Sequence, residues 1–234
     1  MTTAPNFFTY DFYERLLDVL RLKQFSFRRF GESGEGKSAY LRHDLDFSLE
    51  LALKMGRFEA ERGVKATYFV MLETEAYQAK EKGQILKDLL AFGHQVGLHY
   101  VMSPEPKIRE QVDMLSEIID EEVTVFSVHR PAHLSTQGMD VSQIHVKGVL
   151  NVYEPAFFKP GQYISDSNHF WRCGDPMAFL SGYSRPMIQI LTHPIWWVDS
   201  ESDRWEKVRA FLDLSEPHMV RYFQENVAFI SEKV

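Results

Sequence analysis

The segment YLRHDLDFS, residues 40–48, places titratable side chains at the point where an apolar strand should end. Asp44 and Asp46 are separated there by a single residue. Two carboxylates at a strand end could divide the work of hydrolysis, because one can bind a metal ion while the other accepts a proton from water. The segment therefore indicates a site for metal-assisted hydrolysis.

Three further apolar segments end in a similar way. QVGLHY, FSVHRP and QILTHP pass from apolar residues to His99, to His129 with Arg130, and to His193. In parallel α/β folds the carboxyl ends of the strands share one face, so these side chains are expected to meet the two aspartates. Burying such groups without a partner is costly, so polar residues at four strand ends are not expected to be chance members of the core. A structural salt-bridge network around Arg130 is the alternative.

The chemistry of this set points to hydrolysis of an amide or an ester. Aspartate and histidine are ligands for Zn²⁺ and similar divalent ions, and a catalytic site keeps one position open for water. Arg130 beside the second carboxylate would hold it ionised, because a nearby positive charge lowers the pKa of an acid. His193 could give a proton to the leaving group. No organic cofactor is needed.

The elements that must position these groups alternate between helix and strand patterns. Apolar spacing predicts helices at residues 11–23, 48–62, 78–92 and 105–120. Strands are predicted at SAYLR, VKATYFVML, QVGLHY, VTVFSVHRP and MIQILTHP. Residues 132–186 are predicted to be irregular, and residues 201–231 to carry two amphipathic helices. This order predicts a single domain, residues 1–234, with a parallel sheet: a complete or distorted β/α barrel, or an open doubly wound sheet.

The sequence also contains the spacing GxxxxGKS, which is typical of phosphate-binding loops. Gly31, Gly36, Lys37 and Ser38 satisfy it. A phosphate-binding loop must leave a buried strand and open a helix, whereas here the apolar strand SAYLR follows. We interpret residues 31–37 as a turn.

Composition and charge exclude several classes of partner. With 44% hydrophobic residues, 25% charged residues and a formal net charge of −7, the chain has the make-up of a globular protein without a basic face for nucleic acid or anionic membrane. Its single cysteine, Cys173, rules out an internal disulfide framework. The N-terminus resembles neither a secretory signal nor a transit peptide, and no run is long enough for a transmembrane helix. We expect a cytoplasmic protein without membrane insertion.

The order of these motifs resembles the polysaccharide deacetylase family, carbohydrate esterase family 4. HDLDFS is similar to its aspartate motif, GHQVGLHY to the stretch leading to a metal-binding histidine, HRPAH to its arginine-proline motif, and ILTHP to its last histidine motif. SDSNHFW resembles the aspartate and tryptophan motif that lines the acyl pocket. The match runs from about residue 40 to residue 195.

The resemblance implies a distorted β/α barrel with fewer than eight parallel strands, and a role for each matched residue. Asp44 is the implied base, Arg130 its tether and His193 the acid. Asp46 and His99 are the implied metal ligands. The implied substrate-binding residues are Asp166, Trp171 and Trp196. The activity implied is removal of an N-acyl group, such as acetyl, from an amino sugar by a zinc-dependent hydrolase.

The extended forms RHDxDFS, HRP and THPxWW resemble a subgroup associated with surface-polysaccharide biosynthesis, including lipopolysaccharide. The substrate would then be a small acylated amino sugar, linked to a nucleotide or to a lipid. Neither a nucleic acid nor membrane insertion is expected.

One position departs from the family. The second metal-binding histidine usually follows the first by four residues, but position 103 is Ser103. We choose His129 as the third ligand, ahead of His133 and His169, because it lies at an adjacent strand end. Two alternatives stay open: a metal-free hydrolase of cyclic amides or imides on the same fold, and a catalytically silent member that binds a glycan.

Several aromatic and imidazole side chains have two interpretations. His43 could point into the helical layer or orient a site aspartate. Trp196 and Trp197 could form a wall for sugar stacking or belong to the core. His94 follows Gly93 in a turn, so we expect it to face solvent.

Overall fold

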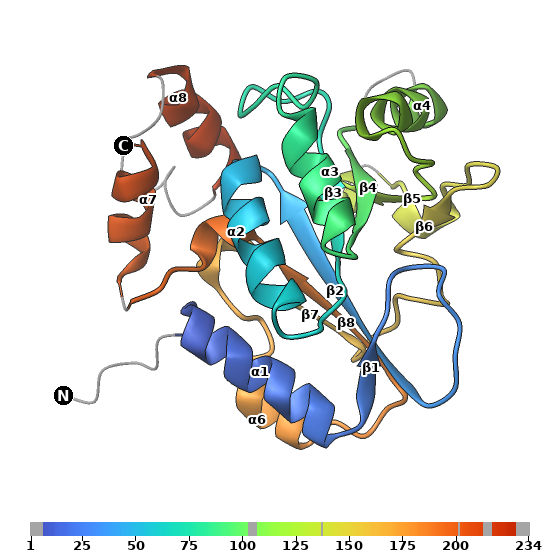
Figure 1. Ribbon diagram of the computed structural model, residues 1–234, viewed down its shortest axis with the longest axis vertical. Helices are drawn as coiled ribbons and strands as arrows, with labels where there is room; N and C mark the ends of the chain where they lie inside the picture. Colours follow the sequence, from blue (N-terminus) through green and yellow to red (C-terminus); the bar gives the residue numbers. More distant parts are fainter. Residues whose placement is uncertain (1–6, 103–106, 137, 201, 213–216, 228–234) are drawn as a thin grey trace.

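The computed structural model describes residues 7–102, 107–136, 138–200, 202–212 and 217–227. Strands and helices alternate along most of the chain (Figure 1). In chain order the elements are α1 (Tyr10–Leu22), β1 (Phe25–Phe27), β2 (Lys37–Leu45), α2 (Leu49–Ala60), β3 (Thr67–Val70), α3 (Gly83–Ala91), β4 (Gln95–Tyr100), α4 (Ile108–Ile119), β5 (Val125–Val128), α5 (Pro131–Thr136), η1 (Val141–Gln143), β6 (Leu150–Asn151), β7 (Tyr163–Ser165), η2 (Ser167–His169), α6 (Pro176–Ser181), β8 (Met187–Thr192), η3 (Pro194–Trp196), α7 (Arg204–Leu212) and α8 (Pro217–Asn226).

The sheet is parallel throughout its described pairings. Its main path runs β6-β5-β4-β3-β2-β8-β7, and β1 branches from β2. β1 pairs with residues 37–39 and β3 with residues 42–45, so the two lie along the same edge of β2 at different heights. This parallel half-barrel with surrounding helices confirms the expected distorted β/α barrel. All carboxyl ends along the path therefore open on one side.

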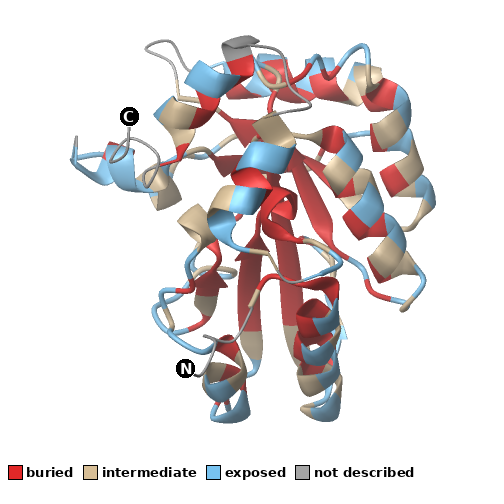
Figure 2. Ribbon diagram, turned by 90° about the vertical axis from the view of Figure 1, so that its left-hand side faces the viewer, coloured by how far each residue is buried: buried red, intermediate tan, exposed pale blue. Residues whose placement is uncertain are grey.

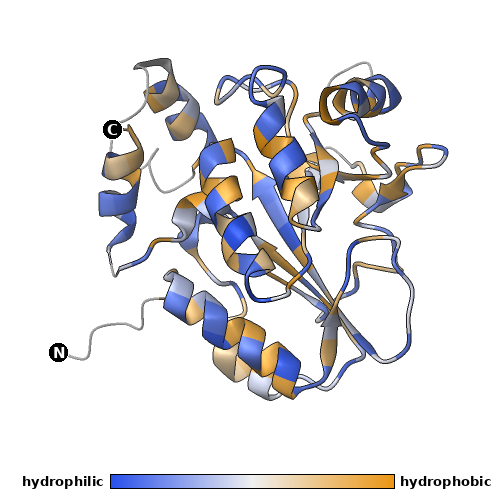
Figure 3. Cartoon of the chain, in the orientation of Figure 1, coloured by the Kyte–Doolittle hydropathy of each residue, from blue (hydrophilic) through white to orange (hydrophobic). Residues whose placement is uncertain are grey.

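The strands are buried because helices cover the outer face of the sheet. In Figure 1, α2 and α3 lie across the sheet, and Figure 2 shows the central strands buried along most of their length. The helices that cover them carry apolar and polar stripes (Figure 3). Close packing also depends on Gly97 in β4, where a Cβ atom would lie 2.6 Å from the Phe69 ring.

Most expected elements are present. Several are shorter than expected, whereas β4 coincides with QVGLHY and β2 extends beyond SAYLR at both ends. α2 begins after Ser48, whose hydroxyl accepts a hydrogen bond from the Leu51 amide at 3.2 Å. The described part of residues 132–186, expected to be irregular, also contains most of α5, all of α6, two 3-10 helices and two short strands. Lys37 opens β2 rather than a helix, and residues 31–36 before it form no helix or strand, which agrees with a turn there. Among the described residues, no helix is both long and apolar enough to cross a membrane.

Candidate active site

The carboxyl ends of the strands surround a cavity of about 810 Å³. Seven of the residues expected in the site line this cavity, whereas Asp166 and Trp171 do not. The seven are Asp44, Asp46, His99, His129, Arg130, His193 and Trp196. They come from the ends of β2, β4, β5 and β8, as parallel strand order requires.

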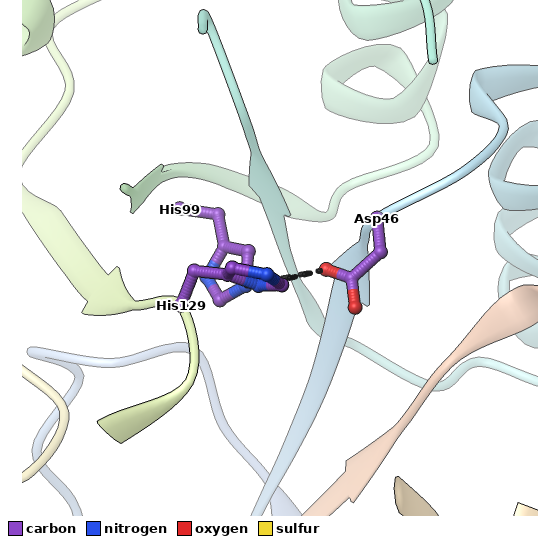
Figure 4. Close-up of side chains that lie close together, drawn as sticks. All are labelled: Asp46, His99 and His129. Carbon is purple, nitrogen blue, oxygen red and sulfur yellow. Dashed lines mark hydrogen bonds and ion pairs between the residues drawn. The ribbon is translucent and has the colours of Figure 1, made fainter. Parts of the chain in front are cut away.

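Asp46, His99 and His129 lie close together as one cluster (Figure 4). Nε2 of His99 lies 3.3 Å from Oδ1 of Asp46 and 3.2 Å from Nδ1 of His129. Nδ1 of His129 lies 3.6 Å from the same Asp46 oxygen. Three atoms that can each bind a metal ion therefore converge on one point, from three different strand ends.

The outer hydrogen bonds of the two imidazoles fix which nitrogens face the cluster. Asn226 of α8 donates its Nδ2 proton to the Tyr222 carbonyl at 2.7 Å, so its Oδ1 faces Nε2 of His129 at 3.2 Å. An amide oxygen only accepts, so Nε2 of His129 carries the proton and Nδ1 presents a lone pair to the cluster. Nδ1 of His99 lies 2.7 Å from Oγ of Ser127, which suits the same arrangement.

The cluster fits a divalent cation by distance and by chemistry. Zinc bonds of about 2.0–2.1 Å in a tetrahedral site place neighbouring ligand atoms about 3.3–3.4 Å apart, close to the separations found here. Oδ1 of Asp46 is buried and makes no hydrogen bond to any described residue. Desolvation lowers the pKa of His129, which favours the neutral imidazole that a metal needs. The residues present therefore fit the metal expected from the sequence.

Asp44 is held by Arg42, two residues earlier on the same strand. Nε and Nη2 of Arg42 donate to Oδ1 and Oδ2 of Asp44, each at 2.8 Å, and both side chains are buried. Burial would raise the pKa of Asp44, but the charge and hydrogen bonds of Arg42 outweigh it and hold that pKa below its usual value. Asp44 is therefore ionised at neutral pH.

Arg130 does not occupy the position expected from the sequence. Its guanidinium donates to the carbonyl oxygen of Glu225, and the guanidinium on Asp44 is that of Arg42. The reason is strand geometry: side chains two residues apart on β2 share a face, so Arg42 already lies beside Asp44. Arg130 is exposed and its backbone is left-handed, with φ of 51°.

His193 is held by Asp166, which follows β7. Asp166 is fully buried and accepts hydrogen bonds from Nδ1 of His193 at 2.6 Å, from the His193 amide at 3.0 Å and from Nε1 of Trp197 at 3.0 Å. Burial would lower the pKa of His193, but attraction to Asp166 and their hydrogen bond raise it to about 9. The imidazole is therefore protonated at neutral pH, and its Nε2 lies 3.8 Å from Oδ2 of Asp46.

The remaining expected contacts differ in placement. Asp166 was expected to line the acyl pocket but does not line the cavity. Its carboxylate instead accepts the hydrogen bonds from His193 and Trp197 described above. Trp171 is buried away from the cavity and stacks towards Phe8, with ring centroids 6.3 Å apart. Trp196 is only 2% exposed, yet it lines the cavity. Ser103, which stands where the family usually has its second metal-binding histidine, lies outside the described residues.

The outer face of β2 carries a second buried polar group. His43 places Nε2 3.0 Å from Oε1 of Glu59 in α2 and Nδ1 2.6 Å from Oγ1 of Thr192 in β8. Glu59 also accepts hydrogen bonds from the hydroxyls of Tyr13 at 2.5 Å and Tyr68 at 2.6 Å. His43 thus points into the helical layer, the first of its two interpretations.

The geometry supplies the parts of a hydrolytic site. An ionised carboxylate and a protonated imidazole face the same cavity beside a cluster that fits a divalent ion. The sequence interpretation missed Arg42 and Asn226. Arg42 could have been found from its spacing, because a charged residue two positions before a strand-end aspartate must share its face. Asn226 left no such signal, since it lies 97 residues from His129.

Comparison with known proteins gives similarity to solved structures alone. No family model matches the sequence, and no curated protein matches it. A carbohydrate esterase family 4 pseudoenzyme from Bacillus anthracis is 14% identical, with a TM-score of 0.43 over 77% of this chain and 61% of that chain. A family 4 carbohydrate esterase from the same organism is 14% identical, with a TM-score of 0.43 over 85% of this chain and 84% of that one. A family 4 esterase from Streptococcus mutans is 16% identical, with a TM-score of 0.43 over 82% and 83%.

Proposed function

We propose that this chain is a metal-dependent hydrolase that removes an N-acyl group, such as acetyl, from an amino sugar. The observation that carries the proposal is the convergence of Asp46, His99 and His129 in one cavity with Asp44 and His193. The order of motifs in the sequence resembles that of polysaccharide deacetylases, which supports an acylated amino sugar of surface-polysaccharide biosynthesis as the substrate.

Asp46, His99 and His129 would hold the ion, most simply Zn²⁺ given two imidazoles and one carboxylate. A divalent ion there would polarise the acyl carbonyl and lower the pKa of a water molecule. Ser127 and Asn226 would keep the two imidazoles turned towards the ion through the hydrogen bonds already described.

Asp44 is the base in this proposal. Arg42 keeps it ionised and fixes its orientation through two hydrogen bonds, so its carboxylate can accept the proton of the attacking water. Oδ2 of Asp44 lies 3.6 Å from Nε2 of His99, which places the base next to the metal cluster.

His193 is the acid. Its protonated imidazole can give the proton at Nε2 to the amine nitrogen as the acyl carbon–nitrogen bond breaks, which turns a poor leaving group into a neutral amine. Asp166 stabilises the imidazolium before the transfer and holds the ring by its other nitrogen. The cavity wall adds Tyr153, Phe158 and Trp196, aromatic rings that could pack against the apolar faces of a sugar.

Metal content per chain tests the proposal. Elemental analysis should find near one equivalent of Zn²⁺ or another divalent ion in the wild-type protein and in Asp44→Asn, which leaves all three ligands in place. Asp46→Ala should lose it. Absence of metal from all three proteins, even after supplementation, would leave the metal-free amidase or a silent glycan-binding protein.

Release of acyl groups from N-acetylated amino sugars tests the chemistry separately. Asp44→Asn should lower kcat by about 10²–10⁴-fold, the usual contribution of a general base. A glycan-binding protein without activity would instead show no turnover in the wild type and unchanged sugar binding in the variant.

A further inference from the structure

We infer that the substrate carries a multiply charged anion, a phosphate ester or diphosphate, bound at the rim of the cavity by Arg130 and Arg172. This inference rests on the proposed function, since it concerns the substrate of that same site. The anion would bind in the part of the cavity away from Asp44 and His193.

Arg130 is available for such a contact because Asp44 does not need it. Arg42 supplies both hydrogen bonds to the Asp44 carboxylate. The Arg130 guanidinium contacts the uncharged carbonyl of Glu225, and none of the ion pairs found among the described residues involves it. Its left-handed backbone is costly for a residue with a side chain, and such conformations gather at binding sites. The fold thus keeps an exposed guanidinium at the cavity.

Arg172 comes from the far end of the sheet path. It lies between η2 and α6, after β7, whereas Arg130 follows β5, yet both line the same cavity. Arg172 is exposed, and no ion pair in the described part of the chain includes it. Two arginines therefore line one cavity from segments that follow β5 and β7, strands separated by four others in the sheet path.

Charge balance favours an anion at these two arginines. The acids that line the cavity are Asp44, Asp46 and Glu225. Asp44 is paired with Arg42 and Asp46 lies among imidazoles, which leaves the exposed Glu225 as one negative charge against two arginines. Two unpaired arginines at one cavity are unexpected in a chain of net charge −7 and unnecessary for an uncharged amino sugar. The guanidinium fork matches phosphate oxygens.

The size of the cavity agrees with a substrate longer than one sugar ring. Its volume of about 810 Å³ lies in the upper part of the range of about 300–1,000 Å³ typical of small-molecule sites. A phosphate-linked sugar would place its acyl group over Asp44 and its phosphates at the rim.

Calorimetric titration tests the inference with three probes at constant ionic strength: inorganic pyrophosphate, uridine diphosphate and geranyl diphosphate. Wild-type protein should bind pyrophosphate, and Arg130→Gln/Arg172→Gln should bind it at least about tenfold more weakly, since each arginine supplies a charge-assisted hydrogen bond. Arg15→Gln, on the exposed side of α1 and outside the cavity, should bind as the wild type does. Tighter binding of uridine diphosphate would indicate a nucleotide carrier, and tighter binding of geranyl diphosphate a lipid carrier.

Equal binding by the double variant, or no binding of any probe by the wild type, would overturn the inference. Metal content is measured on the same samples to separate the two hypotheses. Arginine-dependent binding by a protein that holds no metal would contradict the proposed function alone. A normal metal content without anion binding would contradict this inference alone.

Discussion

At the scale of single residues, the alternation of β2 decides which side chains can act together. Arg42 and Asp44 on β2, and Asp46 just after it, all line the cavity, so one short segment supplies the proposed base, its tether and a proposed metal ligand. The arginine expected to be the tether, Arg130, lies on another strand end. Arg42 takes this position because side chains two residues apart on a strand share a face.

A double-mutant cycle measures the Arg42–Asp44 pair. Arg42→Gln should lower the free energy of unfolding by about 3–5 kcal/mol, because it leaves a buried carboxylate without its partner. Adding Asp44→Asn should recover part of that loss, whereas Arg15→Gln should change stability by less than about 0.5 kcal/mol. Urea denaturation gives all of these values. Additive effects of the two substitutions would contradict direct pairing.

Asn226 provides a second test, because it sets the protonated nitrogen of His129. Asn226→Ala should weaken metal affinity by about 10–100-fold, the usual cost of losing an outer hydrogen bond to a ligand. Asn226→Asp keeps an oxygen acceptor towards His129 and should retain affinity. Competition with a chromophoric chelator measures both without any substrate. Unchanged affinity in the alanine variant would remove Asn226 from the site.

At the scale of elements, β2 is also the link between the site and the helical cover. Its outer face places His43 between Glu59 of α2 and Thr192 of β8, and Thr192 immediately precedes His193. The buried Glu59 carboxylate accepts three hydrogen bonds from side chains. This network therefore joins α1, α2, β2, β3 and β8 on the side of β2 away from the cavity.

Stability should depend on pH through Glu59. Burial would raise the pKa of Glu59, but the charge of His43 and the hydrogen bonds to Glu59 outweigh it and hold that pKa below its usual value. A carboxylate whose pKa is lower in the folded state stabilises the fold fully at pH values above its pKa in the unfolded state. This stabilisation is lost as the pH falls through its pKa in the folded state. Glu59→Gln should thus cost about 3–5 kcal/mol near pH 7 and less in acid. Urea denaturation of the wild type and the variant from pH 7 to pH 3 measures this, with Glu121→Gln, at an exposed position, as the control. A difference in unfolding free energy between wild type and Glu59→Gln that stays constant with pH would contradict the prediction.

The sequence predicted these elements better than their contacts. QVGLHY and MIQILTHP matched β4 and β8 because a short, mostly apolar run is a local signal of a buried strand. His94 was expected in solvent but is fully buried, since Nε2 bonds the Gly56 carbonyl at 2.9 Å and Nδ1 accepts from the Ala66 amide at 3.2 Å. Those partners are 38 and 28 residues away. Tertiary partners of this kind leave no local pattern.

At the scale of the whole molecule, the proposed metal cluster lies where distant parts of the chain meet. Its members follow or end β2, β4 and β5, and α8 contacts the cluster from the C-terminal region through Asn226. Tyr222 of the same helix donates to the Asp46 carbonyl at 3.3 Å. A bound ion would therefore connect the half-barrel to its last described helix, and the unfolded chain would not preserve this arrangement.

Metal removal should consequently destabilise the protein as a whole. An ion that binds the folded state alone stabilises it by about 2.7 kcal/mol at a free concentration of 100 times Kd. For a chain of this size that corresponds to a rise in Tm of about 5–11 °C, since 1 kcal/mol shifts Tm by about 2–4 °C. Thermal unfolding with a chelator and with added Zn²⁺ measures the difference. Asp46→Ala should show no response to zinc, because the ion would lose its carboxylate ligand. An equal rise in the variant would place the stabilising ion elsewhere, and no rise in the wild type would contradict the proposed metal site itself.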